Sequence, residues 1–346
     1  MMFQTRTRVH TQAAQQQERQ AGYCAALRAM AAVQLGAQLL LWITFFGYDR
    51  VQQTVWQSAL MTGPVMAALY LLWKNAAPNR WAALALLPCL QLDACLALLA
   101  LSGLIAQAIP QYPAWVGAVV PCAACVLTVL RAGTRGVGYG AKLFQWLLLG
   151  LFVLSTVFLR ASDRADRLWP ILGSGLGPTA LAALAGAGSV WGTALLFALP
   201  QEGQPPQKAL RWALIPWVLG CVWALWFGFV RPWAAGDALA VAEKMMGLAR
   251  HAMSVMLYEL AGVLWLLLLP LALCGCAAST ELLMRRAWPR LPRPFPAVVA
   301  LLPSCLMLLC DAGQALRVLE TLLPYRAPVA LACGAALCVL RGKGKK

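Results

Sequence analysis

The stretch ALAGAGSVWGTALLFALP, Ala183 to Pro200, is apolar enough for a membrane helix but holds three glycines, Gly186, Gly188 and Gly192. Glycine in a helix interior is unfavourable by about 1 kcal/mol relative to alanine. In lipid, a loosened backbone also leaves its amide and carbonyl groups without water to satisfy them. The glycines therefore predict either a break at a ligand site or a face where a neighbouring helix packs closely.

The composition places the chain in a bilayer. Of its 346 residues, 61% are hydrophobic and 12% are charged, whereas soluble domains are about 45–50% apolar and about 25% charged. Apolar segments near the length of a membrane span of about 20 residues number about ten, and eight remains possible because the last two are short. We place them at Ala29–Phe46, Val51–Trp73, Trp81–Ile109, Ala114–Leu130, Leu143–Leu159, Leu176–Leu199, Trp212–Val230, Met253–Ala278, Ala297–Cys310 and Pro328–Leu340.

The basic residues predict the orientation. With the amino terminus inside, the inner loops hold roughly twice as many lysines and arginines as the outer loops, which include Arg317 and Arg326, as the positive-inside rule requires. We expect a polar cytoplasmic tail (1–22), a membrane domain (23–340) and a basic cytoplasmic tail (341–346). Because the basic residues are scattered over many loops, the net charge of +16 reflects topology and not nucleic-acid binding.

Enzymatic motifs and metal-ligand patterns are sparse. Most of the 12 cysteines lie in apolar spans, where free cysteine acts as a small hydrophobe, and PCAAC (121–125) and CGC (274–276) lack paired ligands at zinc spacing. There is no P-loop, G-x-S-x-G or H-E-x-x-H motif. We expect no enzyme, no cofactor and no metal site.

An inverted repeat of helices would give the glycines a function in ligand binding. Many secondary transporters consist of inverted repeats whose first helices are broken near the midplane, so that free backbone groups face a ligand. Repeats over about 23–160 and 168–340 make spans one and six the broken pair. In span one, Gly36 lies between Gln34 and Gln38. In span six, the three glycines are accompanied by three further residues, so the predicted ligand-binding set is Gln34, Gly36, Gln38, Gly186, Gly188, Ser189, Trp191, Gly192 and Thr193, with the free helix ends binding a carboxylate.

Two acidic residues extend that set. Asp93, in CLQLDACL, lies near the middle of span three, where burying an acid costs at least about 2.5 kcal/mol. It either contacts a ligand ammonium or an ion, or pairs structurally with Arg28 or a neighbouring glutamine. In span eight, Tyr258 is a further predicted ligand-binding residue, and Glu259 beside it either completes the ligand site or faces the membrane interface.

The segment RLWPILGSGLGPTALAALAGAGSVWGTALLFALP, from Arg167 to Pro200, resembles span six of the B subunits of bacterial spore germinant receptors. The matching positions are Pro170, Gly173, Gly177, Pro178, Trp191, Gly192 and Pro200. QLGAQLLL, VWQSALMTGPVMAALYLLWK, PQYPAW and YELAGVLW also resemble that family, in the same order. One departure is Thr193, where the family commonly has Glu.

This resemblance implies a fold: an all-α membrane protein of the amino acid, polyamine and organocation transporter superfamily, with a LeuT-like five-plus-five repeat. It also implies a receptor subunit in the inner membrane of a spore-forming bacterium. Such a subunit binds a small nutrient, typically an amino acid, and works with an A-type membrane subunit and a C-type lipoprotein. Because the residues expected around the ligand side chain are mainly apolar, we expect a small neutral amino acid. Two alternatives are an ion-coupled amino acid permease and a membrane scaffold without a ligand.

Overall fold

The computed structural model describes residues 25–26, 28–39, 41–42, 55–73, 80–108, 111, 113–158, 175–198, 214–215, 217–222, 224–225, 255–292, 294–310 and 312–343. These residues are almost entirely helical and include no strand. The helices are α3 (Val55–Trp73), α4 (Arg80–Ala108), α5 (Ala114–Phe158), α6 (Leu176–Ala198), α9 (Val255–Ala287), α10 (Pro294–Cys310) and α11 (Ala312–Lys343). Helical turns also occur at residues 28–39 and in the described parts of 214–225.

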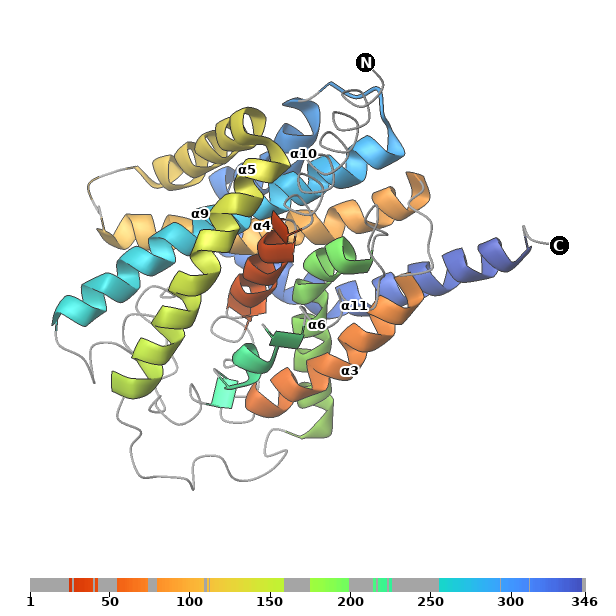
Figure 1. The fold of residues 1–346 in the computed structure, drawn as a ribbon, viewed down its shortest axis with the longest axis horizontal. Coiled ribbons are helices and arrows are strands. Elements are labelled where there is room, and N and C mark those ends of the chain that lie inside the picture. The colour runs from red at the N-terminus through yellow and green to blue at the C-terminus, as the bar shows by residue number, and fades with distance from the viewer. Residues whose placement is uncertain are drawn as a thin grey trace, which may run out of the picture.

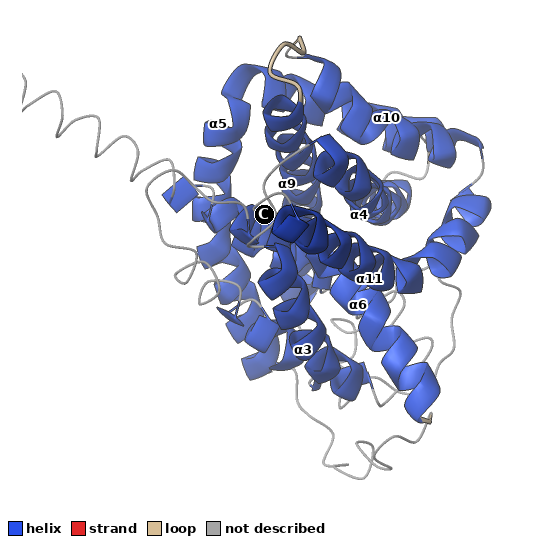
Figure 2. Ribbon diagram, turned by 90° about the vertical axis from the view of Figure 1, so that its right-hand side faces the viewer, coloured by secondary structure: helices blue, strands red, loops and turns tan. Residues whose placement is uncertain are grey.

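The helices form two groups around a central segment. In one group, α4, α5, α9 and α10 pack against one another, and in the other α3, α6 and α11 do so. Helix α11 also packs against α4, which joins the groups. Residues 28–39, red in Figure 1, lie in the middle of the molecule, and Leu35, Ala37 and Leu39 have no exposed surface. A second view shows α4, α9 and α11 side by side (Figure 2). The central segment is therefore enclosed by both groups.

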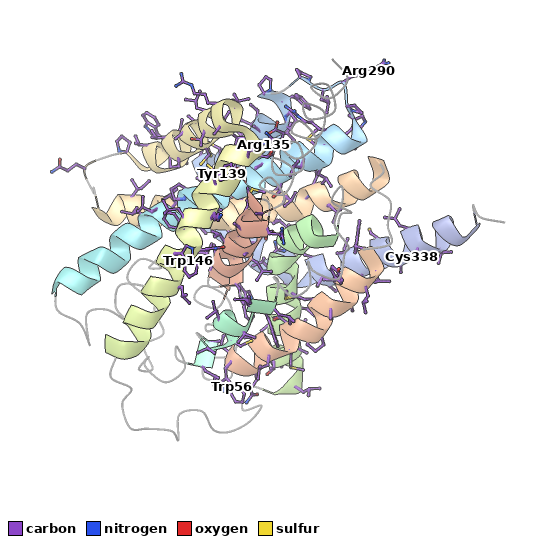
Figure 3. All side chains as sticks on the ribbon, in the orientation of Figure 1. Trp56, Arg135, Tyr139, Trp146, Arg290 and Cys338 are labelled. Atoms are coloured by element: carbon purple, nitrogen blue, oxygen red, sulfur yellow. The ribbon has the colours of Figure 1, made fainter. Side chains whose placement is uncertain are left out.

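The chain is a multi-pass membrane protein. Five of the described helical stretches are long and apolar enough to cross a bilayer: Val55–Trp73, Leu86–Ala106, Trp115–Trp146, Leu266–Arg285 and Arg317–Val339. Large side chains face outward from them. Tyr139 and Trp146 on α5 (Figure 3) are 56% and 66% exposed, and their spacing of seven places them on one face of the helix. Such a surface suits contact with lipid.

Helix α5 contains two helices, as the prediction of two successive spans requires, but the loop expected at residues 131–142 is replaced by a single kink. Between Ala114 and Phe158 the backbone is helical except at Gly133, where the two helices meet. Gly133 has φ 62° and ψ −176°, a conformation that costs glycine little because it has no Cβ. One glycine therefore redirects the chain where we expected a loop.

Helix α11 is longer than the predicted span Pro328–Leu340. It begins at Ala312 and continues through Pro324 and Pro328, so Arg326 lies inside the helix and is 4% exposed. Its assignment to an outer loop is wrong. Prolines are tolerated in membrane helices where packed neighbours satisfy the freed backbone groups, and α11 packs against α6, α4 and α3.

The predicted helix breaks at Gly36 and at Gly186–Gly192 are also wrong. Residues 28–39 and α6 are continuous helices through these positions. At Gly186 the reason is close packing, since an added Cβ would lie 2.8 Å from Thr62 Cγ2 and 2.9 Å from the Trp42 ring. Glycine lets membrane helices approach one another in this way. The packing alternative is therefore the correct one at Gly186.

Candidate functional site

Polar side chains collect in the interior where the central segment meets α4 and α9, and where α11 packs against α4. Gln34 and Gln38 of the central segment are 1% and 0% exposed, Asp93 of α4 is 0% exposed, and Ser279 of α9 is 3% exposed. Arg326 of α11 joins them from the far end of the sequence. We call these five residues the buried polar cluster. Buried polar groups cost free energy unless they are paired, so their contacts matter.

Asp93 and Arg326 form a buried ion pair. Arg326 Nη1 donates to Asp93 Oδ1, and the two side chains are 3% and 0% exposed. The pair joins α11 to α4 across 233 residues of sequence. The structural alternative for Asp93 predicted pairing with Arg28 or a glutamine, and the charged partner is instead Arg326. The sequence did not identify it because its position between two prolines is typical of a loop.

Gln38 contacts Asp93 through the backbone. Gln38 Nε2 donates to the Asp93 carbonyl oxygen at 3.1 Å. The side-chain oxygens Gln38 Oε1 and Asp93 Oδ2 are both buried and have no hydrogen-bond partner among the described residues. Most buried polar atoms in proteins have such a partner. Gln38 and Asp93 therefore offer two acceptor atoms in the interior that are free to bind a donor such as an ammonium group.

Gln34 links the central segment to α9. Its Nε2 donates to Cys276 Sγ at 3.1 Å, and its Oε1 accepts from Ser279 Oγ at 3.2 Å. The side chain also lies against Gly275, where an added Cβ would be 3.2 Å from Gln34 Oε1. Both polar ends of Gln34 are thus occupied by α9. Ser279 was not among the predicted site residues, because only the three-dimensional contact distinguishes it from other helix-bonded serines.

The other predicted residues are not brought into this cluster by any described contact. Gly36 is part of the continuous central helix, and no described atom lies within 4 Å of an added Cβ. Gly186 packs against Trp42 and Thr62. Seven further residues lie in helical backbone, but their surroundings fall outside what the structure describes: Gly188, Ser189, Trp191, Gly192 and Thr193 of α6, and Tyr258 and Glu259 of α9.

The described cysteines have free thiols and line the helix interfaces. Cys125 Sγ donates to the Pro270 carbonyl at 3.5 Å, and Cys95 Sγ lies 3.7 Å from Met307 Sδ. Of the ten described cysteines, eight are buried. These contacts fit small apolar residues that fill space between α4, α5, α9 and α10.

Comparisons with known proteins identify the fold. No protein-family model matches the chain, and no curated protein sequence does. Among solved structures, Mhp1, a nucleobase-cation-symport-1 family transporter, closed with bromovinylhydantoin bound, matches at a TM-score of 0.58 and 15% identity. The match covers 89% of this chain and 77% of Mhp1. This protein has a LeuT-like fold. The inward-facing conformation of Mhp1 matches with a TM-score of 0.54, at 15% identity, over 88% of this chain and 75% of that one.

A manganese transporter from Eremococcus coleocola, in complex with an aromatic bis-isothiourea compound, matches with a TM-score of 0.51 at 14% identity. The match covers 92% of this chain and 77% of that one. Mhp1 is bound to bromovinylhydantoin, whereas the second protein is a manganese transporter, so the two similar structures differ in the solute. At such identities the likeness shows the fold alone, so the solute must be argued from the buried polar cluster.

Proposed function

We propose that this protein is a secondary transporter that binds a small polar solute at Asp93, Arg326 and Gln38 of the buried polar cluster. The observation that carries the proposal is the Asp93–Arg326 pair, enclosed between α4 and α11 with Gln38 bonded to Asp93. The LeuT-like fold supports it, because the similar solved structures are transporters. The ion-coupled permease, an alternative at the level of sequence, is thus better supported than a receptor.

The energetic argument favours a functional role for the pair. Inserting a charged residue at the centre of a membrane helix costs about 2.5–3.5 kcal/mol on insertion scales. A buried ion pair seldom stabilises a protein more than apolar residues of similar volume would. Asp93 and Arg326 are therefore poor choices for stability alone, whereas opposite charges inside a helical bundle are useful for binding a polar solute.

Uptake by the purified full-length chain in proteoliposomes tests the proposal. A panel of radiolabelled neutral amino acids, monocarboxylates, amines, nucleobases and Mn²⁺ is offered under inward sodium or proton gradients, with protein-free vesicles as the control. We expect at least one panel member to accumulate and to raise the melting temperature of the detergent-solubilised protein, since a bound ligand stabilises the folded state. Failure of every member to enter contradicts the transporter proposal.

A germinant-receptor B subunit is the second candidate, and it rests on the ordered motifs between Gln34 and Trp265. It predicts that a nutrient binds without being taken up, and that an A-type membrane subunit and a C-type lipoprotein co-purify in the inner membrane of a spore former. Binding without uptake in the same vesicles favours this candidate. The scaffold alternative predicts neither binding nor uptake.

The predicted topology belongs to either candidate. Ten spans in two repeats, about 23–160 and 168–340, place both termini in the cytoplasm. Cysteine-accessibility labelling should find Leu282–Arg293 cytoplasmic and Ala161–Arg167 outside, because basic residues dominate orientation. Labelling from the opposite sides contradicts this topology.

A further inference from the structure

The charges of the buried polar cluster complement those of a zwitterion. Asp93 carries one negative charge and Arg326 one positive charge, and they come from different helices, α4 and α11. The two spare acceptor atoms, Gln38 Oε1 and Asp93 Oδ2, belong to Asp93 itself and to the glutamine that donates to its backbone oxygen. On the other side, a guanidinium presents several N–H donors in a fork that matches a carboxylate.

We infer that the Asp93–Arg326 pair is the recognition site for the zwitterionic head of an α-amino acid. Asp93 and Gln38 accept hydrogen bonds from the ammonium group, and Arg326 donates to the carboxylate. The inference rests on the proposed transport function and names its substrate class. It replaces the predicted carboxylate site at broken helix ends, because the helices continue through Gly36 and Gly186.

Charge balance makes the zwitterion the fitting ligand. The empty pair is neutral, and a zwitterion adds one charge of each sign, so the occupied site is neutral too. A simple carboxylate would leave one excess negative charge, and a simple amine one excess positive charge. An unbalanced charge in a membrane interior is costly. Selection of the ligand therefore follows from the charges of two residues.

The surroundings of Asp93 leave this balance intact. The described neighbours of Asp93 that could titrate are the thiols Cys89, four residues earlier in α4, and Cys276 of α9, which accepts a hydrogen bond from Gln34. Arg326 is the charged group that acts on Asp93 among the described residues. The site thus carries one positive and one negative side chain.

Helix α11 is built so that Arg326 can adjust to a ligand. Pro324 and Pro328 flank Arg326 within the helix. Because proline has no backbone N–H, the helical hydrogen bonds that residues 324 and 328 would donate to the carbonyls four residues earlier are missing. The backbone on both sides of Arg326 is therefore less constrained than in a regular helix. Zwitterion binding requires a small bend there, which would separate the guanidinium from Asp93 and let the ligand head group enter.

Matched ligands of equal size test the inference on the full-length protein. The first set is L-alanine, L-alaninamide and propionate, which carry both charges, the ammonium alone and the carboxylate alone. A second set of L-leucine, L-leucinamide and 4-methylpentanoate keeps side-chain size from deciding the result. Affinities come from thermal shift and from calorimetry. We expect the zwitterion of at least one set to bind at least tenfold more tightly than both of its partners.

Two single variants should switch this preference. Asp93→Asn leaves the site with one positive charge, so propionate should bind more tightly than alanine. Arg326→Gln leaves one negative charge, so alaninamide should bind more tightly than alanine. The double variant Asp93→Asn/Arg326→Gln buries no unpaired charge and should fold even if a single variant does not. It should lose at least tenfold in affinity for the zwitterion. Arg317→Gln, at an exposed position of α11, is the matched control and should behave as wild type.

Each result of these measurements supports or contradicts the zwitterion inference or the transport proposal. A wild-type protein that binds propionate or alaninamide as tightly as alanine, or that binds no member of either set, overturns the inference. A double variant with wild-type affinity for the zwitterion also overturns it. Zwitterion binding without uptake keeps the inference but contradicts transport. Uptake of a different solute from the wider panel, with no zwitterion binding, keeps transport and overturns the inference.

Discussion

Helix α6 around Gly186 and helix α11 around Arg326 present opposite combinations of sequence and structure. The glycine-rich part of α6 is typical of a broken ligand-binding helix, but it is continuous, and Gly186 accommodates Trp42. The proline-flanked part of α11 is typical of a loop, but it is helical and places Arg326 against Asp93 in the interior. Residues that weaken a helix thus mark a packing contact in one region and a buried charge in the other.

The difference has a physical cause. A glycine in a membrane helix can have a purely steric role, because the missing Cβ lets a large side chain approach the backbone. An arginine in a membrane helix cannot serve packing alone, since its buried charge must be paired. A buried charge is therefore a better indicator of function than a helix-weakening residue, provided that the helix containing it is recognised.

The largest expected effect comes from breaking the ion pair. Arg326→Met should destabilise the protein by about 3–5 kcal/mol, because it leaves Asp93 as an unpaired buried charge. The double variant Asp93→Leu/Arg326→Met should recover most of that loss, since apolar residues can replace a buried pair at little cost. Denaturant unfolding of the detergent-solubilised protein measures both. A double variant as unstable as the single one contradicts a simple pairing role.

A Cβ at Gly186 tests the other side of the comparison. Gly186→Ala should destabilise the protein by about 1–3 kcal/mol, the usual cost of overpacking, because the new methyl group meets Thr62 and Trp42 at 2.8 and 2.9 Å. The same unfolding experiment measures the loss. A stabilising Gly186→Ala substitution would mean that α6 gains from alanine as an ordinary helix does, and that the close contact is not important.

Gly36 should respond in the opposite direction. No described atom lies within 4 Å of an added Cβ there, and the surrounding residues are helical. Gly36→Ala should therefore stabilise the protein by up to about 1 kcal/mol, the difference in helix propensity between the two residues. A destabilised Gly36→Ala variant would indicate that the position needs glycine for a contact or a conformation that the continuous helix does not require.

Local pattern predicted much of the fold. The apolar segments Trp81–Ile109 and Leu176–Leu199 correspond to α4 and α6 within one residue at each end, because the length of an apolar run sets the length of a membrane helix. Gln38 and Asp93, both predicted as site residues, do contact each other. What pattern could not provide is the partner of Asp93. The pairing with Arg326 depends on how α11 packs against α4, and no spacing along the chain encodes it.

The smallest expected effect decides whether Gln34 belongs with the packing glycines or with the ion pair. Ser279 and Thr280 both donate to the carbonyl four residues earlier, at 2.6 and 2.9 Å. Ser279 Oγ also lies 3.2 Å from Gln34 Oε1, so its one hydroxyl hydrogen is shared between the two acceptors. Ser279→Ala and Thr280→Val each remove one hydroxyl with little change of shape. A hydrogen bond between membrane helices contributes about 0.6 kcal/mol on average. Ser279→Ala should therefore destabilise the protein by about that much more than Thr280→Val.

Solute affinity completes this last test. If Gln34 serves to hold the central segment against α9, Ser279→Ala should lower stability and leave the affinity for the transported solute within about twofold of wild type, a change of about 0.4 kcal/mol. A tenfold or greater loss of affinity with little loss of stability would instead place Gln34 with Asp93 and Arg326 in the binding site. The segment 28–39 would then present a second glutamine to the ligand, in addition to Gln38.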